Sequence, residues 1–226
     1  MSGKRLASGC CSVVLFILLV AALTVLLRRY LFDVVTVQRD VPECGLLRGD
    51  RLVIDQWSYH YRTQPERGDY AVFRCPPQVD AQHTGGAGLL AGRIMALPGD
   101  TIWFGQEGAV ALSRSYAHGC IWPFVIPARG MQVHMGEGDS LQGTWGMALY
   151  ARVISRHEQG TAPYHRFQHD YYWMQSGGGD DAGDSRYVGP VPRECLTGRA
   201  RMILYSLNDS LPWTRRLRPG RLFLAR

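Results

Sequence analysis

The stretch Gly-Arg-Ile-Met-Ala-Leu-Pro-Gly-Asp-Thr-Ile-Trp-Phe, residues 92–104, indicates how the chain folds. It contains two short apolar runs, at residues 92–97 and 101–104, with a Pro-Gly-Asp sequence between them at residues 98–100. Proline presets the backbone of a turn, glycine accepts a left-handed conformation, and aspartate bonds to nearby backbone groups. Short apolar runs bounded by such residues are typical of β-strands. The stretch therefore predicts two strands joined by a tight turn.

The same alternation of apolar runs and turn residues continues on both sides of this stretch. Gly-Asp pairs at residues 49–50 and 68–69 precede two further runs, and glycine-rich segments at residues 84–88 and 177–179 predict loops. Further strands are predicted at residues 33–37, 51–55, 70–74, 132–135, 171–174 and 200–205. We expect a mostly β domain with closed or stacked sheets.

One helix is predicted, at residues 141–157. Its apolar residues recur at helical spacing and lie roughly on one face; they are Leu141, Trp145, Ala148, Leu149 and Ile154. Five aromatic residues are expected mostly in the core, with one or two available for a surface that rests on a membrane; they are Trp103, Trp122, Phe124, Trp145 and Trp173.

An uncharged segment of 21 residues, 7–27, precedes the β-rich part. At about 1.5 Å per residue it would span a hydrocarbon core of roughly 30 Å. No small-x-small cleavage site follows it, so an uncleaved anchor is favoured over a cleaved signal peptide. The expected organisation is a cytoplasmic N-terminus at residues 1–6, a transmembrane anchor at 7–27 and an exported domain at 28–226.

The charge of the chain is concentrated at its two ends. The 226 residues carry 25 Lys and Arg and 19 Asp and Glu, a net charge of +6. Four basic residues lie in the first 29 and five arginines in the last fourteen, with no acidic residue in either segment. Residues 30–212 therefore hold 16 basic and 19 acidic residues, a net of −3. This balance does not favour a nucleic-acid partner.

The C-terminal arginines allow three interpretations. Arg215, Arg216, Arg218 and Arg221 could contact anionic lipid headgroups. A solvated tail, or a last strand at residues 221–225 with charged flanks, fits the same residues equally well.

The cysteines do not indicate a metal site. Cys44, Cys75, Cys120 and Cys195 follow the apolar segment, and none forms a Cys-x-x-Cys pair. Disulfides are compatible with an exported domain, and the sequence leaves their pairing open. No metal ion or cofactor is expected.

Four segments resemble, in the same order, the sequence boxes of type I signal peptidases. The first joins Phe32-Asp33 to the Gly-Asp pair at residues 49–50, and the second is Arg-Gly-Asp-Tyr-Ala-Val-Phe at residues 67–73. The third is Arg-Ile-Met-Ala-Leu-Pro-Gly-Asp at residues 93–100, and the fourth is Gly-Asp-Ser-Arg-Tyr-Val-Gly-Pro-Val-Pro at residues 183–192. The matching framework residues are Gly49, Asp50, Arg67, Gly68, Asp69, Arg93, Leu97, Pro98, Gly99, Asp100, Asp184, Ser185 and Arg186.

This resemblance covers nearly the whole chain after residue 28. It implies a membrane-anchored serine/lysine endopeptidase of the single-anchor type, which removes signal peptides. It also implies that the β-rich domain lies on the outer side of the cytoplasmic membrane and rests on the bilayer through an apolar surface.

The nucleophile of that family is missing. Counted back without a gap from the first Gly-Asp pair, the position of the serine falls on Val41, and its neighbouring methionine on Pro42. The upstream serine, which helps bind the oxyanion in some members, falls on Arg39. Residues 38–45 contain no Ser or Thr, so a small shift of register does not supply a nucleophile.

The base is missing as well. Serine attack needs a group that takes the hydroxyl proton, and the family uses a lysine whose pKa is lowered by burial. Its position falls on Gly92, and the only lysine of the chain is Lys4. Arg93 cannot replace it because a guanidinium group stays protonated. Residues 176–182 also depart from the Gly-Asp-Asn-Arg-x-x-Ser pattern that usually precedes Asp-Ser-Arg in the family.

The leading hypothesis is a pseudoenzyme that binds signal peptides or exported preproteins, or that assists an active signal peptidase or secretion complex. A second is an active peptidase with relocated groups, for which Cys44 with His60 or His83 is a candidate set. Cys44 lies three residues beyond Val41, about 10 Å along an extended chain, so a buried or disulfide-bonded thiol is favoured. A third hypothesis is a structural envelope protein.

Overall fold

The protein is represented by a computed structural model, which describes residues 13–25, 31–41, 44–59, 64–74, 89–105, 110–112, 122–134, 143–158, 164–176 and 184–225. Its strands are β1 (Phe32–Thr36), β2 (Asp50–Asp55), β3 (Tyr70–Arg74), β4 (Leu89–Ala96), β5 (Thr101–Phe104), β6 (Val110–Ala111), β7 (Trp122–Val125), β8 (Gln132–His134), β9 (Tyr164–Arg166), β10 (Tyr171–Gln175), β11 (Val191–Pro192), β12 (Leu196–Ser206) and β13 (Leu224–Ala225). The helices after residue 30 are α3 (Gly143–His157), α4 (Ser185–Val188), η5 (Arg193–Cys195), η6 (Trp213–Arg215) and η7 (Pro219–Arg221).

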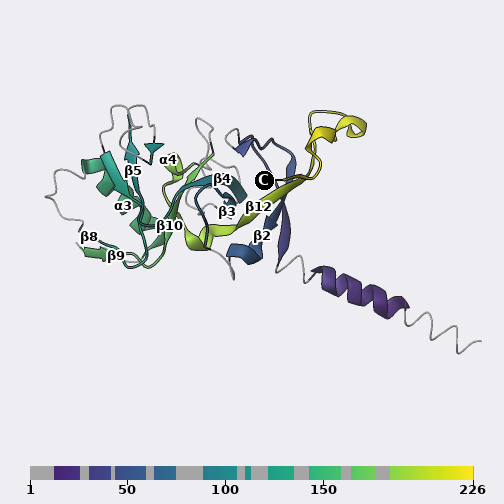
Figure 1. The fold of residues 1–226 in the computed structure, drawn as a ribbon, viewed down its shortest axis with the longest axis horizontal. Helices are drawn as coiled ribbons and strands as arrows, with labels where there is room; N and C mark the ends of the chain where they lie inside the picture. The colour runs from purple at the N-terminus through teal and green to yellow at the C-terminus, as the bar shows by residue number, and fades with distance from the viewer. Residues whose placement is uncertain are drawn as a thin grey trace, which may run out of the picture.

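A curled antiparallel sheet forms the centre of the domain (Figure 1). Its strands follow the order β1-β2-β12-β3-β4-β10-β11, and β13 pairs with β12 beside this path. β12 joins the two halves, because it pairs with β2 over residues 199–206 and with β3 over residues 196–199. Register shifts along β12 bend the strand. The mostly β class is confirmed, but the described main sheet is open, since β1 and β11 end its path unpaired with each other.

The β3–β4 ladder separates two apolar cores. Residues opposite each other in an antiparallel ladder lie on the same face. Phe73 lies opposite Leu90 and faces core 1, whereas Val72 lies opposite Ala91 and faces core 2. Core 1 consists of Tyr59, Ala71, Phe73, Ile94, Tyr172, Met174, Val188, Val191 and Leu196. Core 2 consists of Val35, Val37, Val41, Cys44, Leu46, Leu52, Ile54, Val72, Ala200 and Ile203.

A third, aromatic core joins two smaller sheets to β10. The small sheets are β6-β5-β7 and β8-β9. Trp173 is 1% exposed and packs edge-on against Phe104, with ring centroids 5.5 Å apart, and Phe124 is 2% exposed. The core positions predicted for Trp173 and Phe124 are confirmed, and Trp103 and Trp122 are half-buried.

The buried face of α3 agrees with the predicted one only in part, at Ile154. Tyr150, Val153 and Ile154 are buried, whereas Ala148 is exposed. Tyr150 sets this face because its hydroxyl donates a 2.8 Å hydrogen bond to the carbonyl of Val125. Burial raises the pKa of Tyr150 to about 12, so the hydroxyl remains a donor at neutral pH.

The strand predictions were correct in place but wrong at several boundaries. β4 begins at Leu89, three residues before the predicted start, and β12 extends over Leu196–Ser206. β6, β7, β9 and β11 were missed. β7 is an apolar run, but it contains a proline, which argues against a strand. β9 is a three-residue strand, Tyr-His-Arg, whose single buried side chain is a histidine, so it lacks the apolar run on which the predictions depended.

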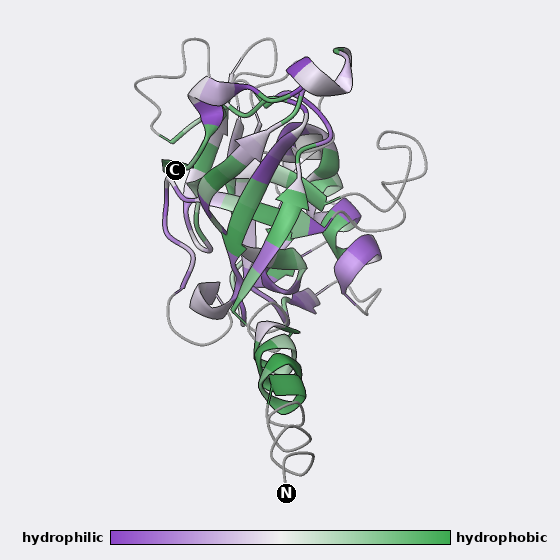
Figure 2. Cartoon of the chain, turned by 90° about the vertical axis from the view of Figure 1, so that its right-hand side faces the viewer, coloured by the Kyte–Doolittle hydropathy of each residue, from purple (hydrophilic) through white to green (hydrophobic). Residues whose placement is uncertain are grey.

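Residues 13–25 form a helix that extends away from the β domain (Figures 1 and 2). Its side chains are exposed, with Val20 at 43% and Leu15 at 68%. In the part of the chain that the structure describes, no helix has both the length and the apolar character needed to cross a membrane.

Candidate functional site

The three Gly-Asp turns share one geometry. In each, the backbone N–H of the aspartate donates to the carbonyl three residues earlier, at 3.0–3.2 Å. The carboxylate of the same aspartate accepts the N–H of that earlier residue, at 2.6–3.2 Å. The preceding glycines have φ between 83° and 93°, a region that side chains disfavour. The predicted turns at Asp50, Asp69 and Asp100 are therefore confirmed, and each aspartate closes its own turn.

Asp50 is fully buried and pairs with Arg221 from the C-terminal segment. The Nε of Arg221 donates at 3.0 Å and its Nη2 at 2.5 Å, and the same guanidinium also donates to the carbonyl of Gly45. Burial by itself would raise the pKa of Asp50. The donors from Arg221, Ser206 and the backbone of Leu47 outweigh this effect and hold the pKa below its usual value. Arg221 is thus part of the fold rather than of a solvated tail.

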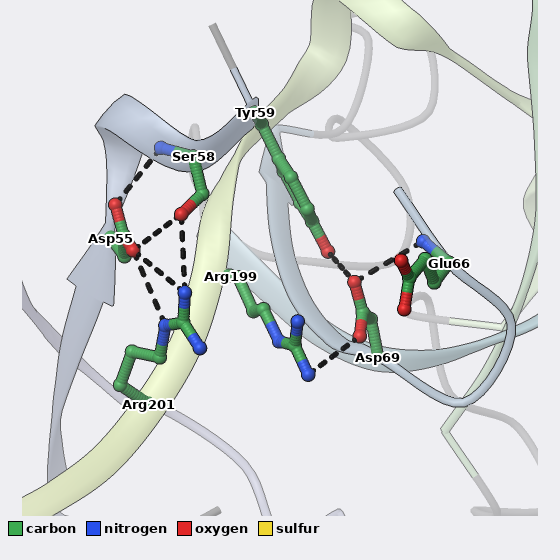
Figure 3. Close-up of polar contacts among 7 residues, drawn as sticks. All are labelled: Asp55, Ser58, Tyr59, Glu66, Asp69, Arg199 and Arg201. Atoms are coloured by element: carbon green, nitrogen blue, oxygen red, sulfur yellow. Dashed lines mark hydrogen bonds and ion pairs between the residues drawn. The ribbon is translucent and has the colours of Figure 1, made fainter. Parts of the chain in front are cut away.

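Asp69 holds a second buried polar cluster, which Figure 3 shows. Its carboxylate accepts the hydroxyl of Tyr59 at 3.0 Å and pairs with Arg199 of β12 at 3.0 Å. Burial, and then the neighbouring Asp69 carboxylate, raise the pKa of Tyr59 well above its usual value. Tyr59 therefore stays protonated and donates. These contacts tie β12 to the turn before β3.

Asp55 forms the neighbouring cluster of Figure 3. It accepts the hydroxyl and the N–H of Ser58, and it pairs with Arg201 at 3.0 Å. The hydroxyl of Ser58 also meets Arg201, at 3.1 Å. Ser58 is thus held by structural contacts with a carboxylate and a guanidinium, and neither group is a neutral base.

The other framework residues also have structural contacts. Asp100 pairs with Arg67 at 2.7 Å, in an ion pair whose arginine side chain is 48% exposed. Asp184 caps α4 through the N–H of Arg186 and also pairs with the side chain of Arg186. Ser185 accepts the N–H of Met174, where the β10–β4 register shifts. The fourth box therefore fastens the end of β10.

Val41 occupies an apolar environment. Its side chain is 4% exposed and belongs to core 2, together with Leu46 and Ile203. Its backbone exchanges two hydrogen bonds with Leu46, at 2.8 and 3.1 Å. This position therefore contributes packing and supplies no polar atom from its side chain.

Gly92 is buried in β4, opposite Ala71 of β3. The ladder places it on the face of Leu90 and Ile94, which belong to or border core 1. Val41 lies in core 2, on the other face. The neighbouring Arg93 is exposed.

Only some of the residues considered for a relocated active site lie in the part of the chain that the structure describes. Cys44 is 1% exposed within core 2, so the expectation of a buried cysteine is confirmed. Cys195 is a free thiol. Cys75, Cys120, His60 and His83 lie outside the described residues. Among the described residues, no three His, Cys, Asp or Glu side chains are grouped to hold a metal ion.

Comparisons with known proteins identify the family. The family model described as signal peptidase, peptidase S26, matches residues 10–205. The chain belongs to the signal peptidase family. It is 24% identical over 220 residues to the signal peptidase I of Aquifex aeolicus, which covers 85% of this chain and 82% of that protein. It is 34% identical over 90 residues to a probable signal peptidase I-1 of a Synechocystis species, covering 38% and 44% of the two chains.

The sequence did not indicate which partners the signal peptidase boxes would have. Arg221, Arg199 and Tyr59 complete the clusters around Asp50 and Asp69, yet they lie 10–171 residues away along the chain. A buried aspartate needs a cationic or donor partner. That rule could have indicated that such partners exist, but not which residues they are.

Proposed function

We propose that this member of the signal peptidase family is a catalytically inactive, membrane-anchored protein that binds signal peptides or exported preproteins. The observation that carries the proposal is the environment of Val41. At the family's nucleophile position the side chain is a 4%-exposed valine in an apolar core, and Gly92 takes the position of the base. A peptide carbonyl bound there would meet no hydroxyl from residue 41 and no amine from residue 92.

The open edge of β4 supports a peptide-binding role. β10 pairs with β4 only between Arg93 and Ala96. Among the described strands, residues 89–92 pair with β3 alone. An unpaired strand edge presents N–H and C=O groups to which an extended peptide can add as another strand. A segment around a signal-peptide cleavage site is small and uncharged, so it fits such an edge beside core 2.

Exposed apolar and basic side chains support a location at the membrane. The helix at residues 13–25 has a continuous apolar surface, and the C-terminal arm exposes Trp213 by 82% beside Arg215 and Arg216. Tryptophan and arginine together favour a bilayer surface with anionic headgroups. An N-terminal anchor with the β domain on the outer side of the cytoplasmic membrane brings that domain to exported chains.

The test uses the full-length protein purified in detergent. It is mixed with a fluorescent preprotein, beside an active signal peptidase as the positive control. The expected result is no cleavage, with retention of the preprotein on the immobilised protein and its displacement by excess synthetic signal peptide. Cleavage that persists through purification would contradict the loss of activity, and absent retention would contradict the binding role.

The anchor is tested separately in membrane fractions. The full-length protein should remain in the membrane pellet after alkaline extraction, and a chain without residues 1–27 should be released. Release of both forms would contradict the anchor and leave the peptide-binding result unaffected.

A further inference from the structure

Ser176 carries a buried hydroxyl that the described fold does not use. The residue is 0% exposed, and its Oγ has no hydrogen-bond partner among the described residues. The other buried serines, Ser58, Ser185 and Ser206, each use their hydroxyl in a bond to another group. A buried polar group without a partner is costly to the folded state. Its presence calls for a partner that the described residues do not supply.

The position of Ser176 follows from the register of β10. Met174 lies opposite Ile94, and Gln175 lies opposite Arg93. Continued by one residue beyond the end of β10, this register would bring Ser176 opposite Gly92. The backbone N–H of Ser176 donates to the buried carboxylate of Asp184 at 3.3 Å, which fixes the backbone at this point. The unused hydroxyl is thus held beside the position that the family gives to its base.

Ser176 also marks the place where β10 ends beside β4. Beyond it, no described strand continues along residues 89–92 on the side away from β3. A peptide that added to this edge would lie in line with β10, and one of its ends would reach Ser176. Gly92 has no side chain that could fill the space opposite the hydroxyl. The site therefore combines an open strand edge with one unsatisfied polar group at its end.

We propose that the hydroxyl of Ser176 hydrogen-bonds a main-chain amide group of an extended peptide paired with residues 89–91 of β4. This inference rests on the proposed peptide-binding function and assigns it a residue. The role is binding alone, because no lysine lies at residue 92 to take a proton from a hydroxyl. The peptide is recognised through its backbone, so the contact favours extended segments with small side chains.

The test measures binding of a fluorescein-labelled synthetic signal peptide to the full-length protein in detergent, by fluorescence anisotropy. Ser176→Ala should weaken binding roughly three- to tenfold, the effect of losing one neutral hydrogen bond. The same variant should keep or raise the melting temperature, since it removes an unsatisfied buried hydroxyl. Ser206→Ala is the matched control. That serine is equally buried, but it bonds to Arg218, so its loss should lower the melting temperature and leave peptide affinity unchanged.

A second measurement locates the contact on the peptide. N-methylation of successive peptide bonds should reveal one position that weakens binding to the wild type and has no further effect in Ser176→Ala. If the wild type and Ser176→Ala bind the peptide with equal affinity, the role of Ser176 is overturned, but the proposed function still stands. Absence of any binding by the wild type would overturn both.

Discussion

The Gly-Asp turn at Asp50 and the residue at position 41 lie close together in the sequence, yet they have opposite chemical character. Asp50 is a fully buried carboxylate that accepts hydrogen bonds from a guanidinium and a backbone N–H. Val41, nine residues earlier, is an apolar side chain in core 2. The turns keep polar groups because each group has a partner within the fold. Val41 has no polar side-chain atom, and it packs against the apolar side chains of core 2.

The largest expected effect is a difference in unfolding free energy between a substitution in a buried Gly-Asp turn and one in a half-exposed turn. Asp50→Ala removes a carboxylate from a pair whose arginine side chain is 18% exposed, and it should cost about 3–5 kcal/mol of unfolding free energy. Asp100→Ala breaks the pair with the half-exposed Arg67 and one turn bond, and it should cost about 1–2 kcal/mol. Urea unfolding of both variants measures the difference. Equal losses would show that burial of the ion pair does not distinguish the two turns.

The glycines of the same two turns give a sharper comparison. A Cβ on Gly49 would lie 1.8 Å from the carbonyl oxygen of Leu207, whereas a Cβ on Gly99 would meet no atom within 4 Å. Gly99→Ala should therefore cost only the left-handed backbone, about 1–2 kcal/mol. Gly49→Ala should cost about 3 kcal/mol, because the backbone at Leu207 must also move. Thermal unfolding measures both, and a smaller loss at Gly49 would contradict the close approach.

The nucleophile position should not tolerate a return to serine. Val41→Ser buries a hydroxyl in core 2 and should cost about 1–3 kcal/mol. Val53→Ser, at a half-buried position on β2, is the control and should cost less. Neither variant should cleave a preprotein, because a serine without a base is a weak nucleophile. Cleavage by Val41→Ser would mean that another group supplies the base.

The smallest effect is a pH dependence with two windows. Burial, and then the nearby Arg156, lower the pKa of His157 to about 4. Between pH 6.5 and about 4 the unfolded chain binds a proton that the folded chain does not, so stability rises with pH in this window. The pKa of Asp50 is also lowered, so its contribution is present above pH 3.8 and is lost as the pH falls through its folded value.

Two substitutions assign these windows. His157→Gln should flatten the stability change between pH 6.5 and 4, and Asp50→Asn should flatten the change below pH 3.8. Unfolding free energies from urea titrations at several pH values measure both slopes. If the slope of unfolding free energy against pH stays unchanged in either variant, another group titrates in that pH window.

Much of the fold could be predicted because its strands carry local signals. The strand at residues 70–74 follows from a short apolar run after a Gly-Asp pair, and the turn at Asp100 follows from a Pro-Gly-Asp sequence. β9 could not be predicted, since two of its three side chains are exposed and the third is His165. The face of α3 was wrong in part, because a contact to Val125 on another element fixes Tyr150.

The sequence by itself determined the family, the mostly β class and the absence of a serine at residue 41 and a lysine at residue 92. These properties depend on which residues occur at which spacing. Only the tertiary structure decided that Arg221 pairs with Asp50, that Cys44 is buried, and that the buried hydroxyl of Ser176, just after β10, has no partner among the described residues. Those relations join residues that are distant along the chain, and burial and hydrogen bonding between them exist only after the sheet has formed.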